Sequence, residues 1–315
     1  MKDLICYYNG EYMKESEVRI GIWDHSFLYG GVFETSRTYN HVPFYWMEHI
    51  DRLFRSCQGA HIDPKLTPED VYNISLKLFE LNKNNLESED DFLLVHRITR
   101  GAHPNITVTP PFPTILVNNK YMNPLYEKMV RFYREGIHLV VARTRQLPPV
   151  CLDPKIKHSN RLCNLNADYE AKMVNPDAFA LMLDINGFAA ECPTQNVFMV
   201  KDGKLLTPRT INCLQGMTRG VILELAKELK IECAETDLCV YDLYNADELF
   251  ITATSFTIYG VAKFNEKLMR KPIPGPITER LFSAFSEKVG INLKDRPASY
   301  IRSRTNNTKP TLRSN

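Results

Sequence analysis

One lysine and one glutamate stand in settings that favour chemistry on an aldehyde. Lys157, in DPKIKHSN, follows a proline-rich turn and precedes a helical pattern. Most lysines at such a position are solvated, but burial in a cleft would lower the pKa and leave a neutral amine that attacks aldehydes. Glu191, in GFAAECPTQNVFMV, lies between a hairpin turn and an apolar strand. It is either an ordinary loop carboxylate or the partner of a pyridine nitrogen, which it would keep protonated so that the ring accepts electrons.

A third feature is typical of phosphate binding. In the run Leu214-Gln215-Gly216-Met217-Thr218-Arg219, the glycine permits a sharp turn and an apolar helical pattern follows. The first N–H groups of a helix, here those of Met217 and Thr218, have no partner inside the helix and attract anions. The alternative is a plain capped surface helix. Arg52, in EHIDRL, and Thr254, at the end of an apolar strand, are further candidates for the same anion.

The sequence argues against several other functions. The eight histidines are isolated, without an HExxH or HxH pattern, so we expect no metal site, and no GxSxG indicates a serine hydrolase. A net charge of +2 with 24% charged residues disfavours nucleic acid or an anionic membrane as partner. Eight scattered cysteines without CxxC, and the lack of a signal-like or membrane-length apolar run, predict a soluble cytoplasmic protein.

Apolar periodicity predicts the elements that position these residues. We expect helices over 46–58, 68–82 and 158–174, and strands over 92–99, 114–117, 137–142 and 249–254. In the helix over 158–174, the spacing assigns the core face to Leu162, Leu165, Tyr169 and Met173. Strand pairs and helices recur without a GxGxxG loop, which favours an α+β fold with two unlike domains.

The domain boundaries follow from length and composition. A chain of 315 residues with 44% hydrophobic content is long enough for two cores. We predict a smaller N-terminal α/β domain over 1–122, a connection over 123–136 and a larger domain over 137–295. The segment 296–315 is basic and poor in apolar residues, and we expect a disordered tail.

Five motifs, in order, resemble the fold-type IV family of pyridoxal-5′-phosphate (PLP) enzymes, which includes branched-chain and D-amino-acid aminotransferases. They are EHIDRL, the K-x-x-N-x-L helix from Lys157, AAECPTQNVFMVKDGKLLTP, LQGMTRGVILELAKEL and TATSF. The resemblance spans about residues 8–290. It implies a larger domain with a β-barrel-like sheet core, a homodimer, and a site between the domains lined partly by the other subunit.

The same resemblance implies the roles of single residues. Lys157 would carry PLP as a Schiff base, and Glu191 would bind its pyridine nitrogen. Leu205 would pack on the ring. The phosphate would be bound by Arg52, Met217, Thr218 and Thr254. The N–H groups of Ser255 and Phe256 would meet the substrate carboxylate, and Phe33 would lie in the substrate pocket.

The substrate-binding residues of known subfamilies are incomplete here. D-Amino-acid aminotransferases use an arginine and a histidine where Asn105 and Thr107 stand, and branched-chain enzymes place a tyrosine at Leu162 and an arginine near Val95. Because side chains alternate along a strand, Arg97 faces the same side as Val95. We hypothesise that Arg97 binds a substrate carboxylate, the alternative being an ion pair with a surface acid.

The sequence therefore predicts a PLP-dependent aminotransferase that acts on an amino acid or amine and a 2-oxo acid. One alternative keeps the cofactor but cleaves a carbon–carbon bond, as aminodeoxychorismate lyases do. Another is a protein that binds PLP without catalysis. Many relatives have a small residue directly after the glutamate, whereas this chain has the larger Cys192, and the altered loop 192–195 would have spoiled the pocket.

Overall fold

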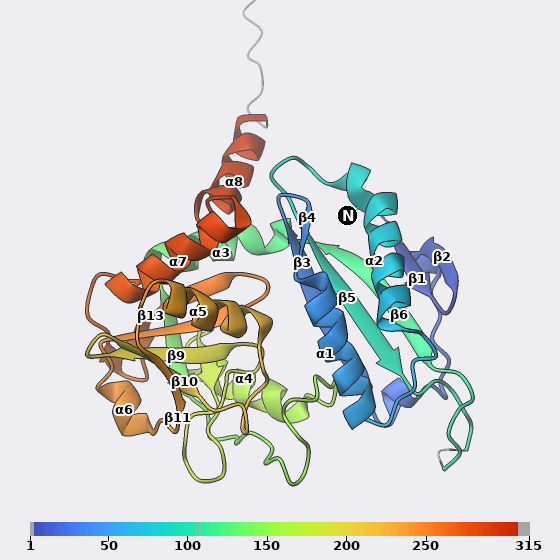
Figure 1. The fold of residues 1–315 in the computed structure, drawn as a ribbon, viewed down its shortest axis with the longest axis horizontal. Helices are drawn as coiled ribbons and strands as arrows, with labels where there is room; N and C mark the ends of the chain where they lie inside the picture. The colour runs from blue at the N-terminus through green and yellow to red at the C-terminus, as the bar shows by residue number, and fades with distance from the viewer. Residues whose placement is uncertain (1–2, 106, 308–315) are drawn as a thin grey trace, which may run out of the picture.

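A computed structural model describes residues 3–105 and 107–307 and divides them between two sheets (Figure 1). The first is antiparallel, in the order β2-β1-β6-β5-β3-β4. Its strands are β1 (Ile5–Tyr8), β2 (Glu11–Lys14), β3 (Val32–Tyr39), β4 (Val42–Phe44), β5 (Phe92–Thr99) and β6 (Thr114–Tyr121). This sheet falls within the predicted smaller domain.

Two helices cover one face of the first sheet, α1 (Trp46–Gly59) and α2 (Pro68–Asn82), and they pack side by side in Figure 1. Both match their predicted ranges within a residue. The apolar side of α1 is buried through Ile50 and Leu53. At the start of α2, Thr67 accepts a hydrogen bond from the Asp70 N–H while the Asp70 carboxylate accepts one from Thr67, a reciprocal cap that fixes where the helix begins.

The second sheet is mixed and has the order β11-β10-β9-β12-β13-β7-β8, with β14 paired to β13. Its strands are β7 (Ile137–Val141), β8 (Phe179–Leu181), β9 (Asn196–Lys201), β10 (Lys204–Pro208), β11 (Cys233–Thr236), β12 (Glu248–Ala253), β13 (Thr257–Phe264) and β14 (Lys267–Leu268). The remaining helices are α3 (Tyr126–Glu135), α4 (Leu162–Val174), α5 (Met217–Glu228), α6 (Val240–Tyr244), α7 (Pro276–Val289) and α8 (Asp295–Asn307). Short 3₁₀ turns span Glu15–Glu17, His25–Phe27, Lys83–Asn85 and Asn123–Leu125. Two sheets with helices packed on them form the expected two-domain α+β fold.

The segment between the sheets packs with the second core. Met122, Tyr126, Met129 and Phe132 are buried in the same hydrophobic cluster as the strands of the second sheet. Tyr133 donates a hydrogen bond from its hydroxyl to the Phe256 carbonyl at 2.6 Å. The stretch predicted as a connection thus forms α3 and belongs to the larger core.

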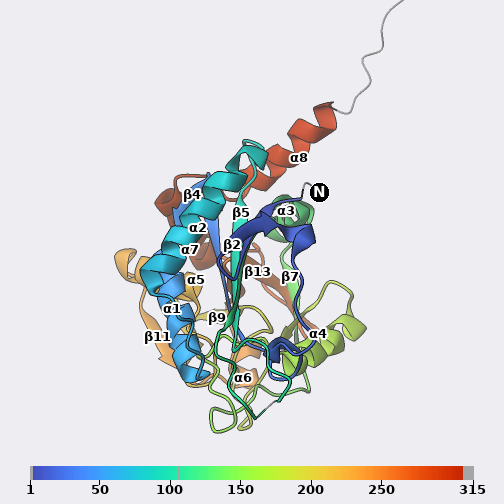
Figure 2. The ribbon, with the colours of Figure 1, turned by 90° about the vertical axis from the view of Figure 1, so that its right-hand side faces the viewer.

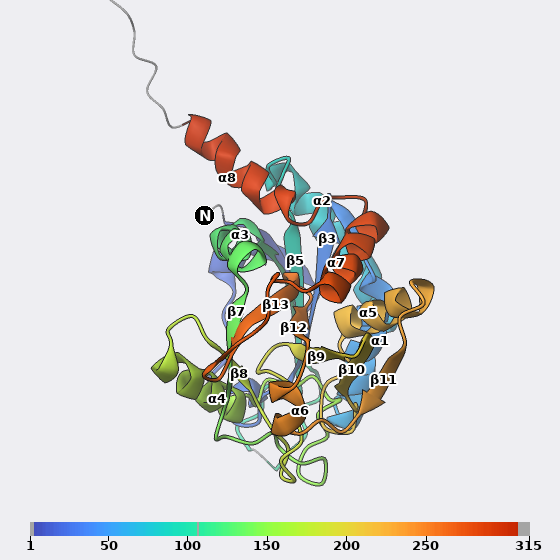
Figure 3. The same ribbon diagram turned by 90° about the vertical axis from the view of Figure 1, so that its left-hand side faces the viewer.

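The predicted buried face of the helix over 158–174 is wrong. Helix α4 begins only at Leu162, and Ala167 and Ala171 face the core. The four larger side chains are exposed, Leu162 to 70% and Met173 to 88%. Small residues let this helix lie close to β7 and β8, so its large apolar side chains point outward, and Figures 2 and 3 show α4 at the margin of the molecule.

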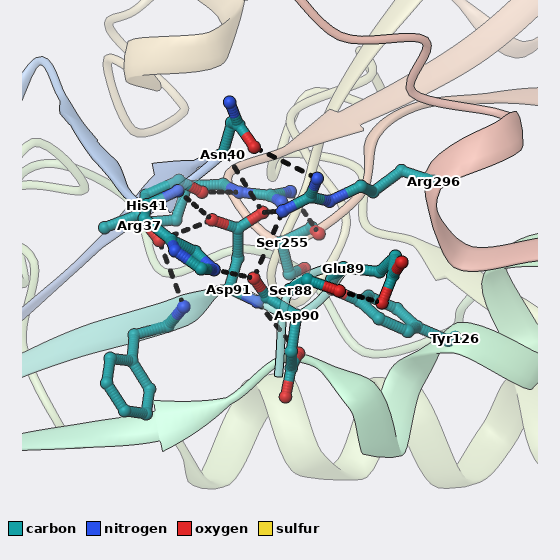
Figure 4. Close-up of polar contacts among 12 residues, drawn as sticks. Arg37, Asn40, His41, Ser88, Glu89, Asp90, Asp91, Tyr126, Ser255 and Arg296 are labelled. Carbon is teal, nitrogen blue, oxygen red and sulfur yellow. Dashed lines mark hydrogen bonds and ion pairs between the residues drawn. The ribbon is translucent and has the colours of Figure 1, made fainter. Parts of the chain in front are cut away.

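The tail prediction also fails over the described residues, because 295–307 form helix α8. Arg296 donates to the Asn40 side chain at 3.1 Å and lies 3.6 Å from the buried Asp91 carboxylate (Figure 4). The Tyr300 ring is buried against Tyr126, at 5.2 Å between centroids. These two residues dock the helix despite its polar composition. The rest of the predicted tail, 308–315, lies outside the described residues.

Candidate functional site

The loop that carries Lys157 belongs to the second half of the chain but is hydrogen-bonded to the first. The Lys157 N–H donates to the Ser56 hydroxyl of α1 at 3.0 Å, and its carbonyl accepts from the Phe33 N–H of β3 at 2.9 Å. Two residues on, the Ser159 N–H donates to the Gly31 carbonyl at 2.8 Å. These bonds hold Lys157 at the junction of the domains, five residues before α4 begins.

The Lys157 amine lies over an aromatic ring, with Nζ 4.6 Å from the Phe33 centroid. Burial is the main reason that the Lys157 pKa is lowered to about 8, and the positive charges of Arg52 and Arg161 act in the same direction. Near neutral pH a useful fraction of this lysine is therefore an unprotonated nucleophile.

Glu191 and Lys157 line one small cavity, which has a volume of about 50 Å³. The Glu191 carboxylate accepts from the Leu214 N–H at 3.1 Å and from the side-chain amides of Gln146 at 3.2 Å and Asn196 at 3.4 Å. Burial nevertheless raises its pKa to about 7, because the loss of solvation outweighs the Leu214 hydrogen bond and the nearby positive charges of Lys157, Arg161 and Arg52. The carboxylate is thus ready to accept a charged N–H donor from a ligand.

The predicted anion turn leads directly into α5. Gly216 is the residue before the helix and makes no side-chain cap, so the N–H groups of Met217 and Thr218 stay available to a ligand. A Cβ at Gly216 would lie 2.0 Å from Asn196 Oδ1, so only glycine fits here. The turn contains a helix N-terminus that can bind a phosphate.

Arg52 reaches this turn from α1. Its Nη1 donates to the Gln215 carbonyl at 2.6 Å, and its Nε and Nη2 each donate to the Glu34 carboxylate at 2.8 Å. Glu34 is fully buried, and His49 Nδ1 lies 3.0 Å from it. Arg52 and His49 hold the Glu34 pKa well below its ordinary value against the effect of burial, so this carboxylate is ionised and fixes the guanidinium of Arg52.

The predicted substrate residues are adjacent in the first sheet. Phe33 of β3 pairs directly with Arg97 of β5, so both side chains lie on the face opposite to that of Glu34. Arg97 is exposed and donates to the Asn118 side chain at 2.6 Å. Its partner is thus an amide, and not the surface acid that was the alternative.

The end of β12 lies beside Asn196, whose side chain donates to the Leu214 carbonyl of the anion turn. Thr252 of β12 pairs with Asn196, and Thr254 follows two residues later. The Ser255 carbonyl accepts from Arg37 Nη1 at 2.9 Å, and the Phe256 ring stacks on Tyr259 at 3.7 Å. These contacts fix the conformation of the loop.

Leu205 is placed differently from what the resemblance implied. It is completely buried in the core of the second sheet, where it pairs with Val200. Leu214 lines the cavity with Lys157 and Glu191 instead. The geometry therefore favours Leu214, not Leu205, as the apolar side chain that would contact a bound ring.

Several site residues were not found from the sequence. Glu34 follows Phe33 on β3, and nothing in the sequence around it indicated that this acid would be buried. His49 lies one helical turn before Arg52 in EHIDRL, and that spacing is a signal for a shared partner. Arg161 and Gln146 were missed because only the folded chain brings them into the cavity.

Two further findings concern the described residues as a whole. Over 3–105 and 107–307 no group of three or more histidine, cysteine, aspartate or glutamate side chains is arranged to hold a metal ion. In the same part of the chain, no helix has the length and apolar character needed to cross a membrane.

Comparisons with known proteins agree with this geometry. The family model for class IV amino-transferases matches residues 31–264. A Methanocaldococcus jannaschii protein bearing the name of a branched-chain-amino-acid aminotransferase is 36% identical, over 92% of this chain and 99% of its own. The D-alanine aminotransferase of Listeria monocytogenes is 30% identical over 89% and 94% of the two chains.

A solved structure shares the fold. The branched-chain amino acid aminotransferase from Escherichia coli superposes with a TM-score of 0.80 at 27% identity and covers 90% of this chain and 93% of its own. The match to the family model includes Lys157, Glu191 and the turn before α5, so the chain belongs to the class IV aminotransferases.

Proposed function

We propose that this protein transfers an amino group between an amino acid or amine and a 2-oxo acid, with PLP bound covalently at Lys157. The observation that supports it best is one cavity holding a lysine of lowered pKa and a carboxylate of raised pKa. Class IV aminotransferases are PLP enzymes, and the family match supports the same cofactor here.

The residues present fit this cofactor. A protonated pyridine nitrogen would supply the charged donor that Glu191 lacks, and would stabilise its ionised form. The N–H groups of Met217 and Thr218, with Arg52 beside them, would bind the phosphate, and Thr254 would complete its contacts. Leu214 would contact the ring.

When bound, the cofactor withdraws electrons from the substrate carbon that carries the amino group. The chain's own residues do the rest. Lys157 Nζ, once free of the aldehyde, takes and returns the proton of that carbon as a general base and acid. Glu191 keeps the ring nitrogen protonated. Phe33 and Arg97 would contact the substrate from β3 and β5, while the N–H groups of Ser255 and Phe256 would meet its carboxylate.

The covalent assignment is tested by reducing the purified protein with borohydride and mapping its peptides. We expect a pyridoxyl mass on the fragment that contains Lys157, no such mass in Lys157→Met, and an unchanged result in Lys155→Met, whose lysine is exposed two residues away. A pyridoxyl group on another lysine, or on none, would refute the assignment.

The reaction is tested with a panel of L- and D-amino acids and chiral amines, following the visible band of the bound cofactor. We expect at least one donor to convert the cofactor to its amino form and a 2-oxo acid to restore it. Pyruvate release from aminodeoxychorismate without any 2-oxo acid, or a band that no donor changes, would contradict transamination.

We also propose a homodimer formed through the outward side of α4. Leu162, Leu165, Tyr169 and Met173 are exposed on this helix, and Phe27, Leu28 and Tyr29 line the same surface cavity as its first turns. An apolar patch of this kind is costly in water and is typical of an interface.

Analytical ultracentrifugation tests this interface. The double variant Leu165→Glu/Met173→Glu should sediment as a monomer, whereas Tyr241→Glu, at an exposed position on α6, should leave the dimer intact. A dimer that survives the double variant would refute the interface. The eight free cysteines support the further proposal that the protein resides in the cytoplasm, which fractionation of its cells would check.

A further inference from the structure

Arg161 lies where the inner cavity meets a larger one. It is the last residue before α4, and it lines both the inner cavity with Lys157 and Glu191 and an outer cavity of about 1260 Å³. Asn164, Pro193, Thr194 and Gln195 line both cavities as well. A molecule that occupies both cavities would therefore lie beside Arg161.

One nitrogen of the Arg161 guanidinium, Nη2, is buried without a hydrogen-bond partner within the described part of the chain. The guanidinium carbon lies 5.7 Å from the centroid of the Phe33 ring, the ring over which the Lys157 amine also lies. Burial lowers the Arg161 pKa against the opposing charge of Glu191, but an arginine keeps its charge at any physiological pH, so a partly buried positive charge without an ion-pair partner lies near the reactive lysine.

The acids near Arg161 are engaged elsewhere. In the outer cavity, Asp168 forms an ion pair with Lys172, and Asp177 pairs with Arg131 at 2.8 Å. In the inner cavity, the Glu191 carboxylate accepts its hydrogen bonds from the Leu214 N–H and two side-chain amides and not from Arg161. No acid in the described part of the chain is therefore hydrogen-bonded or ion-paired to Arg161, and Glu191 acts on it only through its charge at longer range.

We propose that Arg161 binds a carboxylate of the substrate, and so selects amino acids and 2-oxo acids over plain amines. This inference rests on the proposed transamination. A guanidinium offers parallel N–H donors that match a carboxylate, and the unsatisfied Nη2 is available for one of them. Arg97 is less suited to be the first such group, because it is exposed and already donates to Asn118.

The test compares Arg161→Met, Arg161→Gln and Arg161→Lys with the wild-type holoprotein. Arg280→Met is the matched control, since Arg280 is exposed on α7. Equilibrium binding of glutarate, a carboxylate that cannot react, is measured by calorimetry. Steady-state rates are measured with DL-alanine and with racemic 1-phenylethylamine, a donor without a carboxylate.

We expect the neutral variants to bind glutarate about 10-fold to 100-fold more weakly and to show a similar rise in KM for alanine, as loss of a charged hydrogen-bond donor predicts. KM for phenylethylamine should stay within about twofold, and the lysine variant should recover part of the loss because it restores the charge. If the methionine variant does not fold, the glutamine variant, which keeps the side chain polar, carries the same expectation.

Two results would overturn the proposal. One is glutarate affinity and alanine KM within about twofold of the wild type in a folded neutral variant. The other is an equal loss with alanine and phenylethylamine, which would place Arg161 against the cofactor and not the substrate. A wild-type protein that binds glutarate but never transaminates would refute the proposed function instead, so the two failures are distinguishable.

Discussion

Replacing Lys157 with methionine should stabilise the protein when no cofactor is bound. The pKa of this lysine is lowered from 10.5 to about 8 because its charged form is poorly solvated in the folded chain. At 1.36 kcal/mol per pH unit, this difference corresponds to about 3 kcal/mol of destabilisation wherever the lysine is protonated in both states. Methionine has a similar length and no charge, so it removes that penalty with little loss of packing.

The sign of the pH dependence follows from the same values. Below pH 8 both states carry the proton and the full penalty applies. Between pH 8 and 10.5 the folded chain has lost the proton and the unfolded chain still holds it, so the wild type gains stability as the pH rises. The advantage of Lys157→Met should therefore be constant below pH 8 and vanish near pH 10.5.

Urea unfolding of the protein freed of cofactor, from pH 6 to pH 10, measures this difference. Lys155→Met is the control, because Lys155 is exposed and should change the free energy of unfolding by less than about 0.5 kcal/mol. Equal stability of Lys157→Met and wild type at pH 7, or a difference that does not shrink above pH 8, would show that the amine is well solvated and would refute the reasoning.

Three other changes have defined outcomes. Glu34→Gln leaves the buried charge of Arg52 unpaired and should lower the free energy of unfolding at pH 7 by about 3–5 kcal/mol in urea titrations. Because the Glu34 pKa is lowered in the folded chain, the difference in stability between this variant and the wild type should shrink as the pH falls below about 4.5. Gly216→Ala places a Cβ 2.0 Å from Asn196 Oδ1 and should weaken PLP binding about 10-fold in equilibrium dialysis, with thermal unfolding of the cofactor-free protein as the control for a general fold defect. Arg296→Ala removes the hydrogen bonds from α8 to Asn40, between β3 and β4, and to the Asp90 carbonyl just before β5. This variant should be cleaved faster by trypsin within 297–307. An unchanged rate would mean that Tyr300 alone docks the helix.

Helices and strands whose apolar residues all pack on one side within their own domain were predictable from the sequence. Helix α1 and strand β5 each follow one period of apolar residues and were placed within a residue of their observed ends. The buried face of α4 was not predictable in this way, because its contact with β7 and β8 uses Ala167 and Ala171 and leaves the large apolar residues outside. Periodicity shows which apolar residues share one face of a helix. It does not show whether that face packs against the same chain or against another molecule.

The candidate site shows the same division. Lys157, Glu191, Arg52 and the turn at Gly216 could be proposed from motifs because each motif is a short stretch of chain, and the fold brings them close together. Arg161 could not be proposed from a motif. Its importance depends on the folded chain, where Nη2 has no acceptor among the described residues and the acids of the outer cavity form ion pairs with other cations. Only three-dimensional contacts reveal a guanidinium nitrogen that lacks an acceptor.

The site depends on both domains, and this has a consequence for how ligand binding affects stability. Arg52 of the first domain donates to the Gln215 carbonyl of the second, and the Lys157 loop is bonded to Ser56 and Phe33 of the first. A phosphate at the turn would add a second attraction across the same boundary, because Arg52 belongs to the first domain and the N-terminus of α5 to the second. Cofactor binding should therefore stabilise the contact between the domains as well as the cavity.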